Sequence, residues 1–264
     1  MARKVFALRG AKPWSWGYQA YKEEAIKNIV MRREFASTAL PGGYGFRIDE
    51  RAIEYPWLLS RLPSGPGRLL DAGSVLNHEF MVSQPHIAAK KLFISTLAPE
   101  RACFWKRGIS YVYEDLRETC FRDNFFDWIV CLSTLEHVGF DNTLLYTRDD
   151  SKKEHDKTAY QMALKEFRRI LRPGAVLYLS FPFGKYRDHG WFQVFDAPMV
   201  DTVVNVFSPT AVREDHFRYE ADGWQVSTRE KSKDATCFDI HVQKKYDADC
   251  AAFSRAVVCL EMVK

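Results

Sequence analysis

The sequence predicts an α/β protein with a mostly parallel sheet of about seven strands and an antiparallel edge. Two observations carry this prediction. From Gly67 onward short apolar runs alternate with helical stretches, as in repeated strand–helix–strand units, and the chain ends in an apolar, β-branched run at 256–263. The alternating apolar runs are 68–71, 91–96, 110–115, 128–133 and 175–181.

The first 60 residues differ in texture from the rest of the chain. They begin with a Trp- and Gly-rich stretch, continue into a charged helix predicted at 18–35, and reach a break at Pro41-Gly42-Gly43. We therefore expect residues 1–60 to form an N-terminal cap or lid and residues 61–264 to form the α/β domain.

Periodicity assigns the remaining elements in chain order. Between 157 and 171 apolar residues recur at helical spacing, and Pro173-Gly174 ends that helix. A second helix is predicted at 197–207, a strand at 223–231 and the terminal strand at 256–263. The charge-rich stretches 148–157 and 229–234 are predicted to be solvated loops.

The composition is typical of a folded, soluble protein. Hydrophobic residues make up 47% of the chain and charged residues 27%, which excludes a disordered or low-complexity protein. The formal net charge of +4 is small for a dedicated nucleic-acid binder, so no nucleic-acid partner is expected.

Several absences in the sequence indicate a cytoplasmic protein. The N-terminal segment carries Arg3, Lys4, Arg9 and Lys12 but neither the apolar stretch nor the cleavage site of a signal peptide. No window approaches 18 uninterrupted apolar residues, so no membrane span is expected. The six cysteines form no C-x-x-C pair, and we interpret them as reduced and structural.

The most informative stretch is Leu70-Asp71-Ala72-Gly73-Ser74, where an apolar strand runs into a tight turn. A glycine there lets a ligand approach the backbone at the carboxyl end of the strand. The dinucleotide fingerprint G-x-G-x-x-G is not met, because no further glycine follows Gly73 within the motif. By itself the stretch is equally compatible with a ligand site and with a plain strand-to-helix turn.

Four segments together carry a family resemblance: Leu70-Asp71-Ala72-Gly73-Ser74, Tyr113-Glu114-Asp115-Leu116-Arg117, Phe126-Asp127-Trp128-Ile129-Val130-Cys131 and Leu171-Arg172-Pro173-Gly174-Ala175. In order and spacing the chain from about Arg47 onward resembles class I S-adenosylmethionine-dependent methyltransferases. The resemblance implies a Rossmann-like sheet, S-adenosylmethionine as cofactor and no metal. The stretch 133–142, with 96–100 upstream, resembles a bacterial subgroup associated with polysaccharide or glycoconjugate synthesis.

The resemblance also implies roles for particular residues. Asp71 and Gly73 would shape the pocket for the methionine part of the cofactor, with Ala72 and Ser74 in the same turn. Asp115 and Leu116 would face the adenine, because a carboxylate can accept its exocyclic amine while apolar neighbours hold the ring. Residues 132–136, beginning with Leu132 and Ser133, would line the floor beneath the sulfonium.

The chain departs from the family pattern in two places. Val75 and Asn77 stand where the family usually has its second and third glycines, so the loop must either bend differently or narrow the cofactor pocket. The acid that usually holds the ribose hydroxyls falls near Thr96, with Glu100 a few residues later. Either Glu100 substitutes for that acid or the ribose loses its clamp.

Three residues are candidates for catalysis. His137 follows the fourth strand, where ligands gather in open α/β sheets, and a histidine suits proton abstraction from a hydroxyl. His189, in the polar and aromatic loop after the fifth strand, is the second candidate base. Glu136 could orient His137 if the chain turns between them. For both histidines a purely structural role stands beside the catalytic one.

Two further groups have a functional and a simpler interpretation. The acidic and histidine residues Asp141, Asp149, Asp150, His155 and Asp156 match no known metal-ligand spacing and are better explained as a solvated charge run. Trp14, Trp16, Tyr18 and Tyr44 could form an aromatic lid over a sugar or apolar acceptor, and a packed cap explains them equally well.

The leading hypothesis is therefore a methyltransferase that methylates a hydroxyl group of a sugar or related small acceptor. One alternative is N-methylation of an amino sugar or other amine, since the sequence does not separate oxygen from nitrogen acceptors. The other is a non-catalytic binding or assembly protein of glycan synthesis, in which the glycine-poor loop blocks the cofactor.

Overall fold

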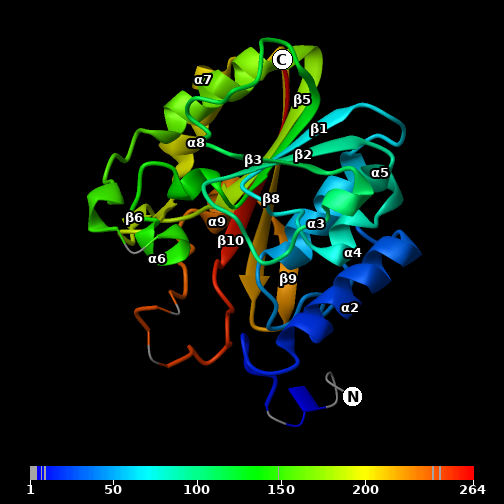
Figure 1. The fold of residues 1–264 in the computed structure, drawn as a ribbon. Coiled ribbons are helices and arrows are strands. Elements are labelled where there is room, and N and C mark those ends of the chain that lie inside the picture. Colours follow the sequence, from blue (N-terminus) through cyan, green and yellow to red (C-terminus); the bar gives the residue numbers. More distant parts are fainter. Residues whose placement is uncertain (1–4, 7, 9, 148, 240, 244) are drawn as a thin grey trace. The chain divides into compact units, whose positions relative to one another are not determined.

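A computed structural model describes residues 5, 6, 8, 10–147, 149–239, 241–243 and 245–264 (Figure 1). Arg3, Lys4 and Arg9 of the N-terminal segment, and Arg148 of the first charge-rich stretch, lie outside the described residues. Within them, no helix is long and apolar enough to cross a membrane.

The described residues contain a sheet of eight strands in the order β3-β2-β1-β4-β5-β10-β8-β9. The β1–β2, β2–β3, β1–β4 and β4–β5 pairs are parallel, whereas β8 and β9 pair antiparallel at the edge. The predicted α/β class, with a mostly parallel sheet and an antiparallel edge, is confirmed. The strands are β1 (Arg68–Ala72), β2 (Lys91–Thr96), β3 (Ser110–Tyr113), β4 (Phe126–Leu132), β5 (Leu171–Pro182), β8 (Ala211–Glu220), β9 (Gly223–Ser227) and β10 (Ala256–Val263).

Helices connect these strands. They are α2 (Tyr18–Arg32), α3 (Arg51–Arg61), α4 (Glu79–Val82), α5 (Pro85–Ala88), α6 (Thr143–Tyr146), α7 (Tyr160–Ile170), α8 (Ala197–Phe207) and α9 (Arg229–Ser232), with the short 3₁₀ helices η1 (Trp105–Arg107), η2 (Leu135–His137) and η3 (Asp150–Lys152). A separate hairpin joins β6 (Arg187–Asp188) to β7 (Gln193–Val194). On α7 the apolar residues that predicted the helix, such as Ala163, Leu164 and Phe167, are buried.

Several predicted boundaries were wrong. The sheet has one strand more than expected, because β8 carries a run of charged residues that hides its buried Phe217 and Tyr219. The strand predicted at 223–231 ends at Ser227, and Thr228 then caps α9 by accepting a hydrogen bond from Lys231 N–H. Part of the loop predicted at 229–234 is therefore helical. The first helix ends at Arg32, because Arg33 adopts a left-handed conformation (φ 55°).

The chain forms two compact units. The first consists of residues 1–62, 182–185 and 215–259, and the second of residues 63–181, 186–214 and 260–264. The predicted boundary near residue 60 coincides with the passage between units, but the N-terminal residues share their unit with a C-terminal segment. The second unit contains β1 to β4 and every candidate site residue. The division into a cap at 1–60 and a domain at 61–264 stays a prediction.

Internal contacts of the first unit involve three of the four aromatic residues suggested as a lid. The Tyr18 hydroxyl donates to Asp49 Oδ2 (2.9 Å), and the Tyr44 hydroxyl donates to the Ala52 carbonyl oxygen (2.6 Å). Trp14 Nε1 donates to the Ala252 carbonyl oxygen (2.8 Å). Trp16 is 58% exposed. These contacts support the packed-cap interpretation for Tyr18, which is buried, and leave the lid a prediction.

Glu50 is a buried carboxyl group of the first unit. Its Oε2 accepts a hydrogen bond from Ser254 N–H (3.3 Å). Burial, together with the neighbouring Asp49 and Glu54 carboxylates, raises the pKa of Glu50 to about 8, against the opposing effect of Arg51. The folded protein therefore retains a proton that the unfolded chain releases near pH ~4.3. Since the folded state binds more protons over this interval, stability falls as the pH rises toward 8.

We expect Glu50→Gln to remove this loss of stability, because the amide keeps an oxygen for Ser254 N–H and has no charge to bury. At pH 9 the free energy of unfolding of the variant should exceed that of the wild type by about 1–3 kcal/mol, the usual cost of an uncompensated buried polar group. Near pH 4.5 the two proteins should agree. Urea denaturation across this range measures the difference, with Glu23→Gln on α2 as control. Equal pH dependence in wild type and Glu50→Gln would contradict the assignment.

Candidate active site

The candidate residues gather at the carboxyl ends of four adjacent strands. In the order β3-β2-β1-β4, the connections from β1 run outward to β2 and β3 on one side, whereas β4 lies on the other side of β1. Ligands of open α/β sheets bind where the strand order reverses in this way, outside the carboxyl ends of the strands. The turn after β1 and the loops after β2, β3 and β4 therefore meet at the site.

Asp71 holds the turn after β1 in place. The residue is fully buried, and its carboxylate accepts hydrogen bonds from the backbone N–H groups of Val75 (3.1 Å) and Leu76 (2.8 Å). Ala72, next to it, is also fully buried. Asp71 thus shapes the turn through the backbone. A direct contact of either residue with a cofactor stays a prediction.

Gly73 and Ser74 form the turn itself. Gly73 has φ +112°, and a Cβ atom added there would lie 2.3 Å from Thr134 Oγ1, in the loop after β4. Only glycine therefore allows the two loops to approach this closely. Ser74 also has a positive φ (62°) and is 6% exposed. Its hydroxyl oxygen has no hydrogen-bond partner within the described part of the chain.

The two missing family glycines are accommodated without a left-handed backbone. Among residues 71–77, positive φ values occur only at Gly73 and Ser74. Val75 and Asn77 are both buried. Asn77 Nδ2 donates to Glu100 Oε2 (3.2 Å) and to the Ala102 carbonyl oxygen (3.0 Å), while its Oδ1 accepts from the Tyr111 hydroxyl (2.9 Å). Asn77 thus connects the loop to the segment after β2. Whether the loop narrows the cofactor pocket stays a prediction.

Thr96 and Glu100 lie near a residue that the sequence analysis did not identify. Thr96 ends β2 and is buried, whereas Glu100 is exposed. Both lie near Tyr146 at the end of α6: burial raises the pKa of this tyrosine, the nearby Thr96 side chain lowers it, and the Glu100 carboxylate raises it. No sequence signal could have found Tyr146, because it comes to this edge from a short helix about 50 residues downstream of Thr96.

Asp115 lies in the loop after β3 and is bound by Arg117. Its Oδ2 accepts from Arg117 Nη2 (2.6 Å) and its Oδ1 from Arg117 N–H (2.8 Å). Burial raises the pKa of Asp115, but these hydrogen bonds outweigh it and the net shift is downward. Asp115 is therefore a carboxylate at neutral pH. Leu116, the other residue predicted to face adenine, is buried.

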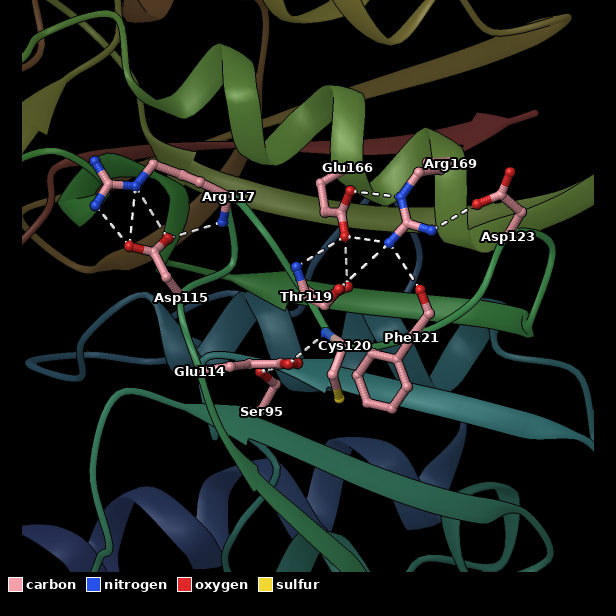
Figure 2. A network of polar contacts seen from close by, with 10 residues as sticks. All are labelled: Ser95, Glu114, Asp115, Arg117, Thr119, Cys120, Phe121, Asp123, Glu166 and Arg169. Atoms are coloured by element: carbon pink, nitrogen blue, oxygen red, sulfur yellow. Dashed lines mark hydrogen bonds and ion pairs between the residues drawn. The ribbon is translucent and has the colours of Figure 1, made fainter.

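The same loop is anchored along its length (Figure 2). Glu114 accepts hydrogen bonds from Ser95 Oγ (3.1 Å) and Cys120 N–H (2.8 Å). Farther on, Glu166 of α7 accepts from Thr119 N–H (2.9 Å), and Arg169 of the same helix donates to the Phe121 carbonyl oxygen (2.7 Å). These contacts connect the loop to β2 and to α7, and so limit the positions that Asp115 can take.

The candidate base, His137, lies in the loop that follows β4. Leu132 is fully buried, and Ser133, with φ 39°, donates its N–H to the Ser180 carbonyl oxygen (2.9 Å). The chain then turns through η2, which supplies the turn that contact between Glu136 and His137 required. His137 Nε2 lies 3.9 Å from Glu136 Oε1, and Glu136 is 1% exposed.

The His137 ring is positioned by the β6–β7 hairpin. Its Nδ1 lies 2.9 Å from the Trp191 carbonyl oxygen, and its ring centroid is 5.0 Å from that of Trp191 and 5.9 Å from that of Phe192. The His189 ring stacks on Phe192 at a centroid distance of 4.3 Å. Both candidate histidines therefore belong to one aromatic cluster. Whether either is catalytic stays a prediction.

The acidic and histidine stretch at 141–156 gives no metal site. Among the residues that the structure describes, no group of three His, Cys, Asp or Glu side chains could hold a metal ion. The carboxylates of Asp141, Asp149 and Asp156 instead accept hydrogen bonds from the N–H groups two residues ahead, at Thr143, Ser151 and Thr158.

The residues at this edge fit S-adenosylmethionine. The buried Ser74 hydroxyl is a polar group that a ligand can satisfy. Asp115 supplies a carboxylate beside the end of β3, and Leu97 and Tyr113, which follow or end the two outer strands, are about half exposed. Apolar surface next to a few polar groups is the usual lining of a site for an adenine-containing ligand.

Comparison with known proteins gives one family match. Residues 86–179, about a third of the chain, match the family model described as a methyltransferase domain. None of the curated proteins compared with the chain matches its sequence.

Solved structures resemble the chain at low identity. A 1,6-didemethyltoxoflavin-N1-methyltransferase of Burkholderia thailandensis is 13% identical over 94% of this chain and 89% of that chain, with a TM-score of 0.47. Phosphoethanolamine N-methyltransferase 2 of Haemonchus contortus is 10% identical over 79% of this chain and 52% of that chain, with a TM-score of 0.46.

The family match concerns the segment 86–179 of the chain. The matched segment is similar to a methyltransferase domain; the protein is an enzyme, and S-adenosylmethionine is its methyl donor. The segment begins within α5 and runs to β5. It therefore includes the loops after β2, β3 and β4 but not the turn at Gly73.

We expect Gly73→Ala to weaken binding of S-adenosylhomocysteine, because the added Cβ would collide with Thr134 and push the two loops apart. Overpacking of this kind costs about 1–3 kcal/mol, which corresponds to roughly 5- to 150-fold in affinity. Isothermal titration calorimetry measures the effect. Gly174→Ala is the matched control, since Gly174 also has a positive φ (+76°) but no atom within 4 Å of its added Cβ. Wild-type affinity in folded Gly73→Ala would show that the turn does not border the cofactor.

Proposed function

We propose that this enzyme methylates a hydroxyl group of a sugar or related small acceptor, with His137 as the general base. One observation carries the proposal: His137 Nδ1 lies 2.9 Å from the Trp191 carbonyl oxygen. A carbonyl oxygen only accepts hydrogen bonds, so Nδ1 must carry the proton of the neutral ring. The second nitrogen, Nε2, then carries the lone pair that can accept a proton.

Glu136 would support this role when its carboxyl group is ionised. Its Oε1 is 3.9 Å from His137 Nε2, beyond hydrogen-bond distance, and it is almost completely buried. A carboxylate in a low-dielectric setting favours the imidazolium that forms when the ring takes a proton. The His137 side chain is 21% exposed, so an acceptor hydroxyl can reach it. His189 stacks on Phe192 and serves in this proposal to shape the cluster.

The cofactor would be held by the loops of the same edge. The Asp71-braced turn with Gly73 and Ser74 would hold the methionine part, Thr96 and Glu100 the ribose, and Asp115 with Leu116 the adenine. Leu132 and Ser133 would lie beneath the sulfonium. When bound, S-adenosylmethionine supplies an electrophilic methyl group, and the protein has to orient the acceptor and remove its proton.

A sugar-type acceptor is supported by two features. The partly exposed Trp191 places its aromatic ring 5.0 Å from the His137 ring between centroids, and aromatic rings commonly pack against the apolar faces of amphipathic ligands. The stretch 133–142 also resembles the bacterial subgroup associated with polysaccharide or glycoconjugate synthesis.

Titration with S-adenosylhomocysteine and an acceptor screen test the proposal together. Hydroxyl and amine acceptors, including sugars, nucleotide sugars and amino sugars, are incubated with S-adenosylmethionine, and formation of S-adenosylhomocysteine is followed. Methylation of a hydroxyl acceptor supports the proposal, and methylation confined to amines overturns its substrate class. A protein that binds no S-adenosylhomocysteine and methylates nothing would be a non-catalytic assembly protein instead.

Asp115→Ala should weaken S-adenosylhomocysteine binding if Asp115 accepts the exocyclic amine of adenine. Losing one hydrogen bond to a charged group costs on the order of 1.5–3 kcal/mol, roughly ten- to a hundredfold in affinity. Asp127→Ala is the control, because Asp127 follows the first residue of β4, at the opposite end of that strand, where its carboxylate accepts a hydrogen bond from Arg68 N–H. Calorimetric affinities equal in both variants would place the adenine elsewhere.

His137→Ala should lower turnover by about 10² to 10⁴, the usual contribution of a general base, and leave S-adenosylhomocysteine affinity nearly unchanged. Turnover is measured at saturating cofactor from pH 6 to 9, with His86→Ala on α5 as control. A folded His137→Ala enzyme that keeps near-normal turnover throughout this range would exclude His137 as the base.

A further inference from the structure

The β6–β7 hairpin is connected to the loop that follows β4 by two backbone carbonyl groups. The Trp191 carbonyl oxygen lies 2.9 Å from His137 Nδ1, and the Gly190 carbonyl oxygen accepts a hydrogen bond from Asp141 N–H (3.2 Å). Both carbonyls belong to the turn between β6 and β7. The conformation of this turn therefore decides whether the carbonyl oxygen of Trp191 meets the His137 ring.

One side chain determines that conformation locally. Asp188, the last residue of β6, accepts a hydrogen bond at Oδ1 from Gly190 N–H (2.8 Å). Gly190 has φ +84°, and the turn closes with a hydrogen bond from His189 N–H to the Phe192 carbonyl oxygen (2.9 Å). An aspartate that accepts from the N–H group two residues ahead is a common means of fixing a turn.

Asp188 is in turn held by two side chains from the segment before α7. Its Oδ2 lies 3.2 Å from His155 Nε2 and 3.2 Å from Lys157 Nζ. Gln193, its partner across the hairpin, donates from Nε2 to the Lys157 carbonyl oxygen (3.1 Å). The His155 ring also packs edge-on against Phe140 at 5.5 Å between centroids. The hairpin, the 155–157 segment and the loop after β4 thus form one connected unit.

We propose that Asp188 is a positioning residue for the reaction, which holds the Trp191 carbonyl oxygen against His137 Nδ1 by closing the hairpin turn. This inference rests on the proposed function, in which His137 Nε2 takes the proton of the acceptor hydroxyl. The effect of Asp188 passes through Gly190 and Trp191 to the ring, and keeps the ring in the tautomer whose Nε2 can accept a proton.

The direct test is the tautomer of His137, read from the ¹⁵N chemical shifts of its ring in labelled protein at a pH where the ring is neutral. In the wild type we expect Nδ1 to be protonated and Nε2 not. In Asp188→Ala the two shifts should move toward each other, as in a mixture of tautomers. Asp188→Asn keeps an oxygen for Gly190 N–H and should stay near the wild type. Unchanged shifts in folded Asp188→Ala would overturn the proposal.

Asp149→Ala is the matched control for this measurement. Asp149 makes the same kind of local contact, from Oδ1 to Ser151 N–H (3.0 Å), at an exposed position outside the hairpin. Its removal should leave the His137 shifts and S-adenosylhomocysteine affinity at their wild-type values. A change as large as that in Asp188→Ala would show that the shifts report general loosening and would overturn the specific role of Asp188.

Kinetics separate failure of this inference from failure of the proposed function. Asp188→Ala should lower kcat by roughly ten- to a hundredfold, the size expected for misplacing a catalytic group, with S-adenosylhomocysteine affinity within about twofold of the wild type. In a His137→Ala background Asp188→Ala should have no further effect, because both act through one ring. Additive losses would overturn the positioning role. Normal turnover in His137→Ala alone would overturn the proposed function, and the tautomer measurement would still decide the role of Asp188.

Discussion

The site depends first on the buried Asp71 carboxylate and on the hydrogen bonds that it accepts from two backbone N–H groups. A carboxylate without solvent contact is unfavourable unless its lone pairs are used, and Val75 and Leu76 N–H use them. The pairing fixes how the chain leaves β1, and so brings Gly73 against Thr134 in the loop after β4. The relative positions of the two central loops follow from this one interaction, whatever ligand lies above them.

The glycine-poor turn shows how side-chain hydrogen bonds can replace backbone freedom. A loop with three glycines is flexible and must lose conformational entropy on ordering. Here Asn77 has its amide nitrogen and oxygen committed to Glu100, Ala102 and Tyr111, so the turn and the segment after β2 are ordered together. The same replacement explains why Val75 and Asn77 do not require the left-handed conformations that glycines would supply at these positions.

Charged side chains around the site serve mainly to hold loops rather than to present charge. Asp115 forms an ion pair with Arg117. Glu166 and Arg169 anchor residues 119–123, and Asp188 fixes the hairpin that contacts His137. Most of these contacts are partly buried and connect loop to loop, where a multiply bonded charge limits motion more than an isolated surface ion pair does. A methyl-transfer site needs such fixed loops, because the enzyme contributes chiefly by orienting the reactants.

The sequence by itself determined the α/β class, because its apolar runs alternate with helical periods, and it located β2, α8 and β10 to the residue. It also placed Asp71, Thr96, Asp115 and His137 at or beyond the carboxyl ends of consecutive strands, which was enough to predict that they share one edge of the sheet. It could not find β8, because charged residues surround the alternating buried side chains of this strand. It also could not find α9, because the sequence from 223 onward resembles a strand and only the cap at Thr228 starts the helix. Only the tertiary structure could decide that Tyr146 meets Thr96 and that Trp191 meets His137. These contacts join segments about 50 residues apart, and such pairs depend on how loops pack, which local periodicity does not encode.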